Sequence, residues 1–101
     1  MQVIADICIV PMGVGASVSE FVTRAYAILR DAGLNARLHA YGTNVEGDFD
    51  VVMAALKRCH EALHEAGAPR LTTTIRLGTR VDKPQTMADK VRVVEDALAQ
   101  D

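Results

Sequence analysis

The order in which strand-like and helix-like stretches follow one another constrains the fold of this chain more than any other feature. Apolar or alternating runs typical of strands lie at residues 3–10, 35–41, 43–46 and 70–77. Stretches with a helical apolar stripe lie between the first and second of these strands, between the third and fourth, and after the last. This order predicts two βαβ halves joined by a hairpin at Gly42. We expect an α+β, ferredoxin-like βαββαβ sandwich with a four-stranded antiparallel sheet and an extra C-terminal helix.

Each predicted helix shows apolar residues three and four positions apart. The first is expected to start at a capping box formed by Ser17 and Glu20 and to end at Gly33. The second opens at 47–48, and the third is capped by Thr86. The three stripes are Val18, Phe21, Val22, Ala25, Ile28, Leu29 and Ala32; Phe49, Val52, Met53, Leu56, Cys59 and Leu63; and Met87, Val91, Val94 and Leu98.

Length and composition narrow the class of protein. The 101 residues fit a single domain spanning 1–101, and half of them are apolar. A net charge of −2 argues against nucleic-acid or anionic-membrane partners, which select a positive surface. No apolar run reaches the roughly 18 residues of a membrane span. The start of the chain has no basic, signal-like segment, and Cys8 and Cys59 are too few for a disulfide framework. We therefore expect a cytoplasmic protein.

One sheet face is left without a helical cover in this fold. Alternation directs Val3, Ala5, Ile7 and Ile9 toward the helices. The opposite, open face is then expected to carry Ile4, Asp6, Cys8, Val10, Arg37, His39, Tyr41, Thr72, Thr74 and Arg76. Its apolar members predict an oligomer, because contiguous exposed apolar surface usually marks an interface. Its charged members fit equally well a polar pocket or a plain interface with an internal Asp6–Arg76 salt bridge.

Motifs that could support catalysis are weak. Residues 60–64 match the metalloprotease pattern H-E-x-x-H, but the match ends a helix and no further histidine follows it. Gly13 and Gly15 resemble a dinucleotide fingerprint whose third glycine position is Val18. No serine or cysteine has a plausible base beside it. We therefore expect no catalytic residue, no metal and no cofactor. Glu46 borders the open face and is a ligand candidate.

Three segments resemble the thiamine-binding-protein family. They are Ala5-Asp6-Ile7-Cys8-Ile9-Val10-Pro11, the stretch from Gly42-Thr43-Asn44-Val45-Glu46-Gly47 to Met53, and Arg70-Leu71-Thr72-Thr73-Thr74-Ile75-Arg76. The resemblance implies a ferredoxin-like fold, homodimers or homotetramers formed through the sheets, and binding of thiamine or its hydroxymethylpyrimidine precursor without established catalysis. By position it places Asp6, Thr43, Glu46 and Thr74 near the ligand.

The open face adds His39 and Arg76 to these ligand-binding candidates. We thus expect a non-enzymatic thiamine- or pyrimidine-binding protein with its pocket on the open face of a homo-oligomer. The alternative is a structural or regulatory interaction domain whose open face only oligomerises. A zinc-dependent hydrolase using His60 and His64 is a third, weaker interpretation.

Overall fold

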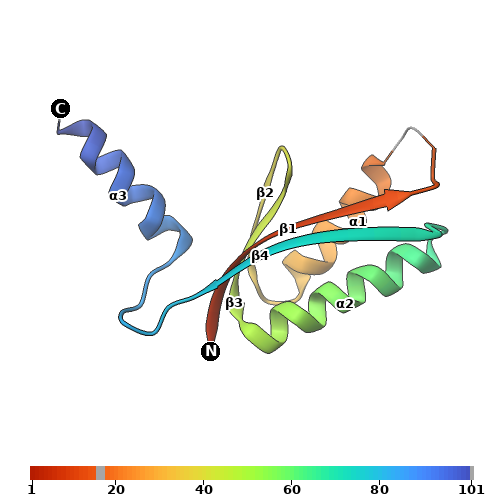
Figure 1. Ribbon diagram of the computed structural model, residues 1–101, viewed down its shortest axis with the longest axis horizontal. Coiled ribbons are helices and arrows are strands. Elements are labelled where there is room, and N and C mark those ends of the chain that lie inside the picture. The colour runs from red at the N-terminus through yellow and green to blue at the C-terminus, as the bar shows by residue number, and fades with distance from the viewer. Residues whose placement is uncertain (16–17, 101) are drawn as a thin grey trace.

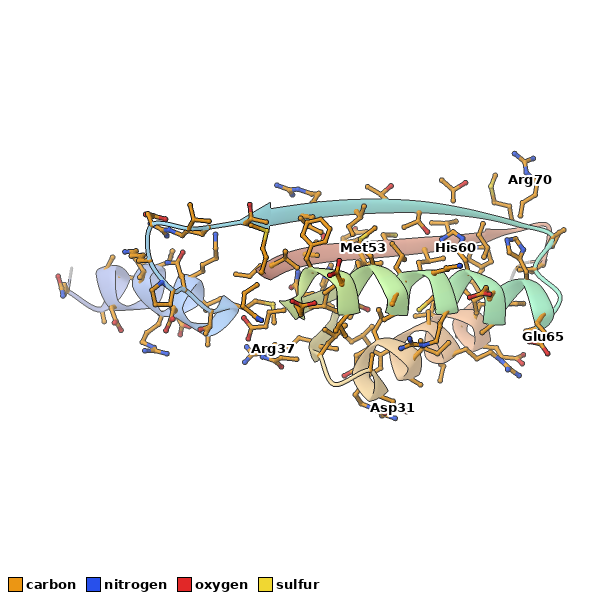
Figure 2. The ribbon with its side chains drawn as sticks, turned by 90° about the horizontal axis from the view of Figure 1, so that it is seen from below. Asp31, Arg37, Met53, His60, Glu65 and Arg70 are labelled. Carbon is orange, nitrogen blue, oxygen red and sulfur yellow. The ribbon has the colours of Figure 1, made fainter. Side chains whose placement is uncertain are left out.

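The predicted order of elements is found in the computed structural model, which describes residues 1–15 and 18–100 (Figure 1). The strands are β1 (Gln2–Met12), β2 (Asn35–His39), β3 (Gly42–Asp48) and β4 (Arg70–Thr79). The helices are α1 (Ser19–Asp31), α2 (Phe49–Glu65) and α3 (Met87–Ala99). The sheet is antiparallel in the order β2-β3-β1-β4, and α1 and α2 lie together on one side of it (Figure 2). This is the expected ferredoxin-like sandwich with an added C-terminal helix.

The core fills the space between the sheet and these two helices. Ile7 and Val45 supply it from the sheet, while Leu29, Val52 and Leu63 supply it from the helices, and all five are almost fully buried. The alternation predicted for β1 is confirmed, since Val3, Ala5 and Ile7 are buried and the residues between them are partly exposed. Aliphatic packing of this kind is the main source of stability in a chain with few aromatic residues.

All four strands differ from their predicted bounds at one or both ends, and two of the differences have a clear local cause. β1 continues through Pro11 to Met12, because its pairing with β3 stops at Ile7 and only β4 accompanies it further. The strand is locally an edge there, and an edge tolerates a residue without an amide proton. β2 stops at His39, so Tyr41 lies in the turn before Gly42, almost fully exposed, and its predicted place on the open face is wrong.

The helix ends follow local chemistry. The Asp48 carboxylate accepts hydrogen bonds from the amides of Asp50 and Val51 and so caps the start of α2. Thr86 caps α3, as predicted, in a capping box with Asp89. α1 begins at Ser19, and Ser17 of its predicted capping box lies outside the described residues.

The third helix stands apart from the rest of the molecule. Figure 1 shows α3 projecting beyond the end of the sheet instead of packing on it. The radius of gyration is 15.3 Å, larger than the roughly 13 Å of a compact chain of this length. The predicted apolar stripe of α3 is therefore mostly solvent-exposed. Neither α3 nor any other helix in the described part of the chain combines the length and apolarity needed to cross a bilayer.

Candidate ligand-binding cleft on the open sheet face

Asp6 occupies the centre of the open face. It lies on β1 between Asn44 of β3 and Arg76 of β4 in the strand register. Residues directly opposite one another in neighbouring strands share a face and lie within reach of each other. The sheet therefore places a carboxylate, an amide and a guanidinium side by side, with His39 from the outer strand next to them.

The contacts of Asp6 differ from the predicted salt bridge. Its Oδ1 accepts from Nε2 of His39 at 2.6 Å and from Nδ2 of Asn44 at 3.3 Å. The amide of Tyr41 donates to Nδ1 of His39, so the proton of the neutral imidazole is on Nε2 and points at Asp6. Within the described residues Asp6 forms no ion pair with Arg76. His39 occupies the carboxylate instead, so the Asp6–Arg76 bridge named for the plain-interface alternative is not found.

Glu46 links the sheet to the start of α3. Its Oε1 accepts from Nδ2 of Asn35 at 2.6 Å, and its Oε2 accepts from the amide of Met87 at 2.8 Å. Met87 is the first residue of α3, and the first amides of a helix have no partner within the helix. Glu46 therefore supplies an acceptor for this helix terminus and ties the first residue of α3 to β3.

A broad cleft of about 1270 Å³ opens over this half of the face. Ile4, Asp6, Asn44, Glu46 and Arg76 line its floor, and residues 79–86 with Lys90 form its wall. The volume slightly exceeds the usual range of roughly 300–1,000 Å³ for small-molecule sites. The cleft thus has room for a ligand of vitamin size.

Hydrogen bonds within the wall hold it in shape. Nε and Nη2 of Arg80 donate to the two carboxylate oxygens of Asp82, and Nη1 donates to Gln85 at 2.6 Å. The bond from Arg80 lowers the pKa of Asp82 below its ordinary value. This arrangement fixes the turn between β4 and α3 and with it the mouth of the cleft.

The six predicted ligand-binding residues do not all meet here. Asp6, Glu46 and Arg76 line the cleft, and His39 contacts it through Asp6. Thr74 lies on the open face opposite Cys8, beyond the cleft lining. Thr43 is buried on the helix side, opposite Ile7, and does not join the group. In a strand, residues three positions apart face opposite ways, so Thr43 and Glu46 cannot share a face.

Two asparagines that form the site were missed in the sequence. Asn44 lines the floor and binds Asp6, and Asn35 binds Glu46. Period-two alternation applied to the predicted strand at 43–46 would have placed Asn44 beside Glu46. Asn35 carried no comparable signal, because its partner depends on the register between β2 and β3.

The H-E-x-x-H histidines lie on the other side of the sheet and have internal partners. Nε2 of His60 is 2.5 Å from Oγ1 of Thr73, and Nδ1 of His64 is 2.8 Å from the carbonyl oxygen of Ala68. In the described part of the chain no group of three or more His, Cys, Asp or Glu side chains is placed to hold a metal ion. The motif here ties α2 to β4 and to the turn that follows the helix.

Comparison with known proteins decides the family. The family model for thiamine-binding proteins matches residues 5–95, which contain every residue of the cleft floor except Ile4. The chain belongs to the thiamine-binding-protein family. The predicted resemblance is confirmed, and the match covers well over half of the sequence.

Relatives of this chain occur in distant organisms. A UPF0045 protein of Synechocystis is 57% identical over 98 residues, which is 97% of this chain and 81% of that protein. The UPF0045 protein ECM15 of Eremothecium gossypii is 44% identical over 100 residues, covering 98% and 95%. The crystal structure of a hypothetical protein from Methanocaldococcus jannaschii superposes with a TM-score of 0.87 at 30% identity, covering 94% of this chain and 97% of that one.

Proposed function

We propose that this chain binds thiamine or a related hydroxymethylpyrimidine in the open-face cleft of a homo-oligomer, without catalysing a reaction. The observation that carries the proposal is the row of Asp6, Asn44 and Arg76 across the cleft floor. Membership of the thiamine-binding-protein family supports thiamine as the ligand. The family description names binding and no reaction.

The chemistry of thiamine fits this row of side chains. The vitamin combines a cationic thiazolium with an aminopyrimidine that both donates and accepts hydrogen bonds. Oδ1 of Asp6 is occupied by His39 and Asn44, while Oδ2 accepts no hydrogen bond from the described residues. A carboxylate with one free oxygen at the floor of a cleft can pair with a cation or an amino group. Asn44 can pair with one edge of the aminopyrimidine, because its amide offers a donor and an acceptor side by side.

Glu46, Arg76 and His39 have supporting roles in the proposed site. Glu46 is a second carboxylate in the lining, and its existing bonds orient it. Arg76 offers donors to hydroxyl or ring-nitrogen acceptors of the ligand. His39 occupies Oδ1 of Asp6 and leaves Oδ2 for the ligand.

Calorimetric titration with thiamine and with hydroxymethylpyrimidine tests the proposal. Asp6→Asn keeps the shape of the side chain and removes its charge. We expect this change to weaken binding about ten- to a hundredfold, the value of one charge-assisted hydrogen bond. Asp31→Asn is the matched control, because Asp31 lies on the helix side (Figure 2) and among the described residues its carboxylate bonds only Arg30. Equal affinity in the two folded variants would refute the role of Asp6.

An interaction domain without a ligand is the second candidate. It is favoured by the exposed apolar side chains of Val10 and Met12 on the open face and by the exposed stripe of α3. An oligomer that binds neither compound at millimolar concentration would select this candidate.

A further inference from the structure

The acidic side chains that line the cleft already have partners within the chain. Both carboxylate oxygens of Glu46 accept hydrogen bonds, and both carboxylate oxygens of Asp82 accept from Arg80. The third acid in the lining, Asp6, accepts hydrogen bonds from the described residues on Oδ1 alone. Of the acidic charge in the cleft, a single carboxylate oxygen is therefore left for a ligand.

The basic side chains of the same lining are mostly without partners. Arg76, Lys83 and Lys90 all line the cleft, and all three are exposed. In the described part of the chain none of them forms an ion pair or donates a side-chain hydrogen bond. The uncompensated charge of the cleft is therefore positive. A concave surface that carries charge of one sign concentrates ions of the other sign.

Three different elements bring these basic side chains to the cleft. Arg76 lies on β4, Lys83 lies in the turn between β4 and α3, and Lys90 lies near the start of α3. Hydrogen bonds hold the last two segments in place, because Arg80 braces the turn and Glu46 binds the first amide of the helix. The basic groups therefore project from a braced frame, which keeps them around one cleft.

The proposed ligand has a position at which a matching negative charge can be attached. Thiamine and hydroxymethylpyrimidine both carry a primary alcohol. The phosphate ester of an alcohol has a charge of about −1.5 to −2 at neutral pH and three oxygens that accept hydrogen bonds. Ammonium and guanidinium groups bind such oxygens through charge-assisted hydrogen bonds. The cleft volume of about 1270 Å³ leaves room for the added phosphate, because it exceeds the usual range for small-molecule sites.

We infer that the cleft takes its ligand as a phosphate ester, whose phosphate oxygens accept hydrogen bonds from Lys83, Lys90 and Arg76. The amino or cationic end of the ligand then faces Oδ2 of Asp6, and the anionic end faces the basic side chains. This inference rests on the proposed function, because it names the chemical form in which the proposed ligand is bound. The free alcohol leaves the three basic groups without a counter-ion, so it binds less tightly than its ester.

Calorimetric titration of the full chain with thiamine and with thiamine monophosphate, in a phosphate-free buffer of low ionic strength, tests the inference. We expect the monophosphate to bind about tenfold more tightly, since each exposed charge pair contributes modestly and three act together. Hydroxymethylpyrimidine and its phosphate form a second pair, for which we expect the same order. The preference for the ester should shrink as sodium chloride is raised, because salt screens exposed charges.

A double variant, Lys83→Gln with Lys90→Gln, tests whether these side chains cause the preference. We expect the ratio of the monophosphate affinity to the thiamine affinity to fall toward one. Lys57→Gln is the matched control, because Lys57 is an exposed lysine of α2 on the helix side and forms no ion pair within the described residues. The control should keep the wild-type ratio. Equal ratios in the double variant and the control would refute the phosphate subsite.

Failure of the phosphate subsite and failure of the proposed function give different results. Thiamine that binds as tightly as its monophosphate, or more tightly, would overturn the phosphate subsite and leave the proposed function standing. No binding of any of the four compounds at millimolar concentration would refute both. Inorganic phosphate is the remaining titrant. If it binds as tightly as the monophosphate, the basic groups form a site for the free ion, and the inference is overturned.

Discussion

Replacing Glu46 by glutamine separates the two roles that the structure gives this residue. The carboxylate accepts one hydrogen bond from Asn35 and one from the Met87 amide at the start of α3. Glutamine keeps a carbonyl oxygen for one donor and turns an N–H toward the other. One charge-assisted bond is therefore lost, and the site is only half-buried, so we expect a cost of about 1–2 kcal/mol in the free energy of unfolding.

Urea unfolding and hydrogen exchange measure this prediction together. The exchange of the Met87 amide should accelerate in Glu46→Gln, since this amide loses its acceptor. Glu61→Gln is the matched control, because Glu61 is an exposed carboxylate of α2 that lies on the helix side. Wild-type stability and unchanged exchange at Met87 would refute the anchoring role.

The same variant also reports on the proposed ligand. If Glu46 contacts a cationic or amine-bearing ligand from the cleft lining, the affinity of Glu46→Gln for thiamine should fall about tenfold or more. Unchanged affinity in the folded variant would leave Asp6 as the anionic partner and confine Glu46 to α3.

Three further predictions concern stability and pH. Burial raises the pKa of the Cys59 thiol from 9.0 to about 11. In a Cys8→Ser background a thiol reagent should therefore react at neutral pH only after unfolding. Because the folded state holds the thiol proton more tightly than the unfolded state, the free energy of unfolding should fall as pH rises from about 9 toward 11. Gly47→Ala should cost about 1–3 kcal/mol in urea unfolding, because the new Cβ would lie 2.5 Å from Cδ2 of buried Leu34, and wild-type stability would contradict this. The hydrogen bond from the N-terminal ammonium, together with those from the helix amides, lowers the pKa of Asp48 below 3.8. The stability that the charged Asp48 carboxylate contributes is therefore present above about pH 4 and lost as pH falls. In Asp48→Asn the free energy of unfolding should decrease less steeply below about pH 4 than in the wild type.

Local periodicity predicted most of the fold because it reports which side of an element meets the core. The alternation along β1 placed Asp6 on the open face correctly, and the stripe of α2 correctly placed Cys59 and Leu63 in the core. The errors arose where a neighbour decides the outcome. Pro11 could remain in a strand because β3, which begins at Gly42, does not extend far enough to pair with it.

The candidate site depended more on register than on pattern. Asp6 bonds His39 instead of Arg76. Predicting this contact requires the register between β2 and β3, which the sequence pattern does not give. Glu46 bonds the start of α3, a contact between residues 41 positions apart in the chain. The stripe of α3 was predicted correctly as a pattern, but periodicity does not say which surface covers a stripe.

The most direct test of the proposed function is to locate the bound ligand. Thiamine is titrated into isotopically labelled protein while backbone amide chemical shifts are followed. The account predicts saturable shifts at Asp6, Asn44, Arg76 and Gly78 around the cleft floor, with α1 and the far side of α2 unchanged. Saturable shifts confined to the helix side, or none at millimolar thiamine, would contradict it.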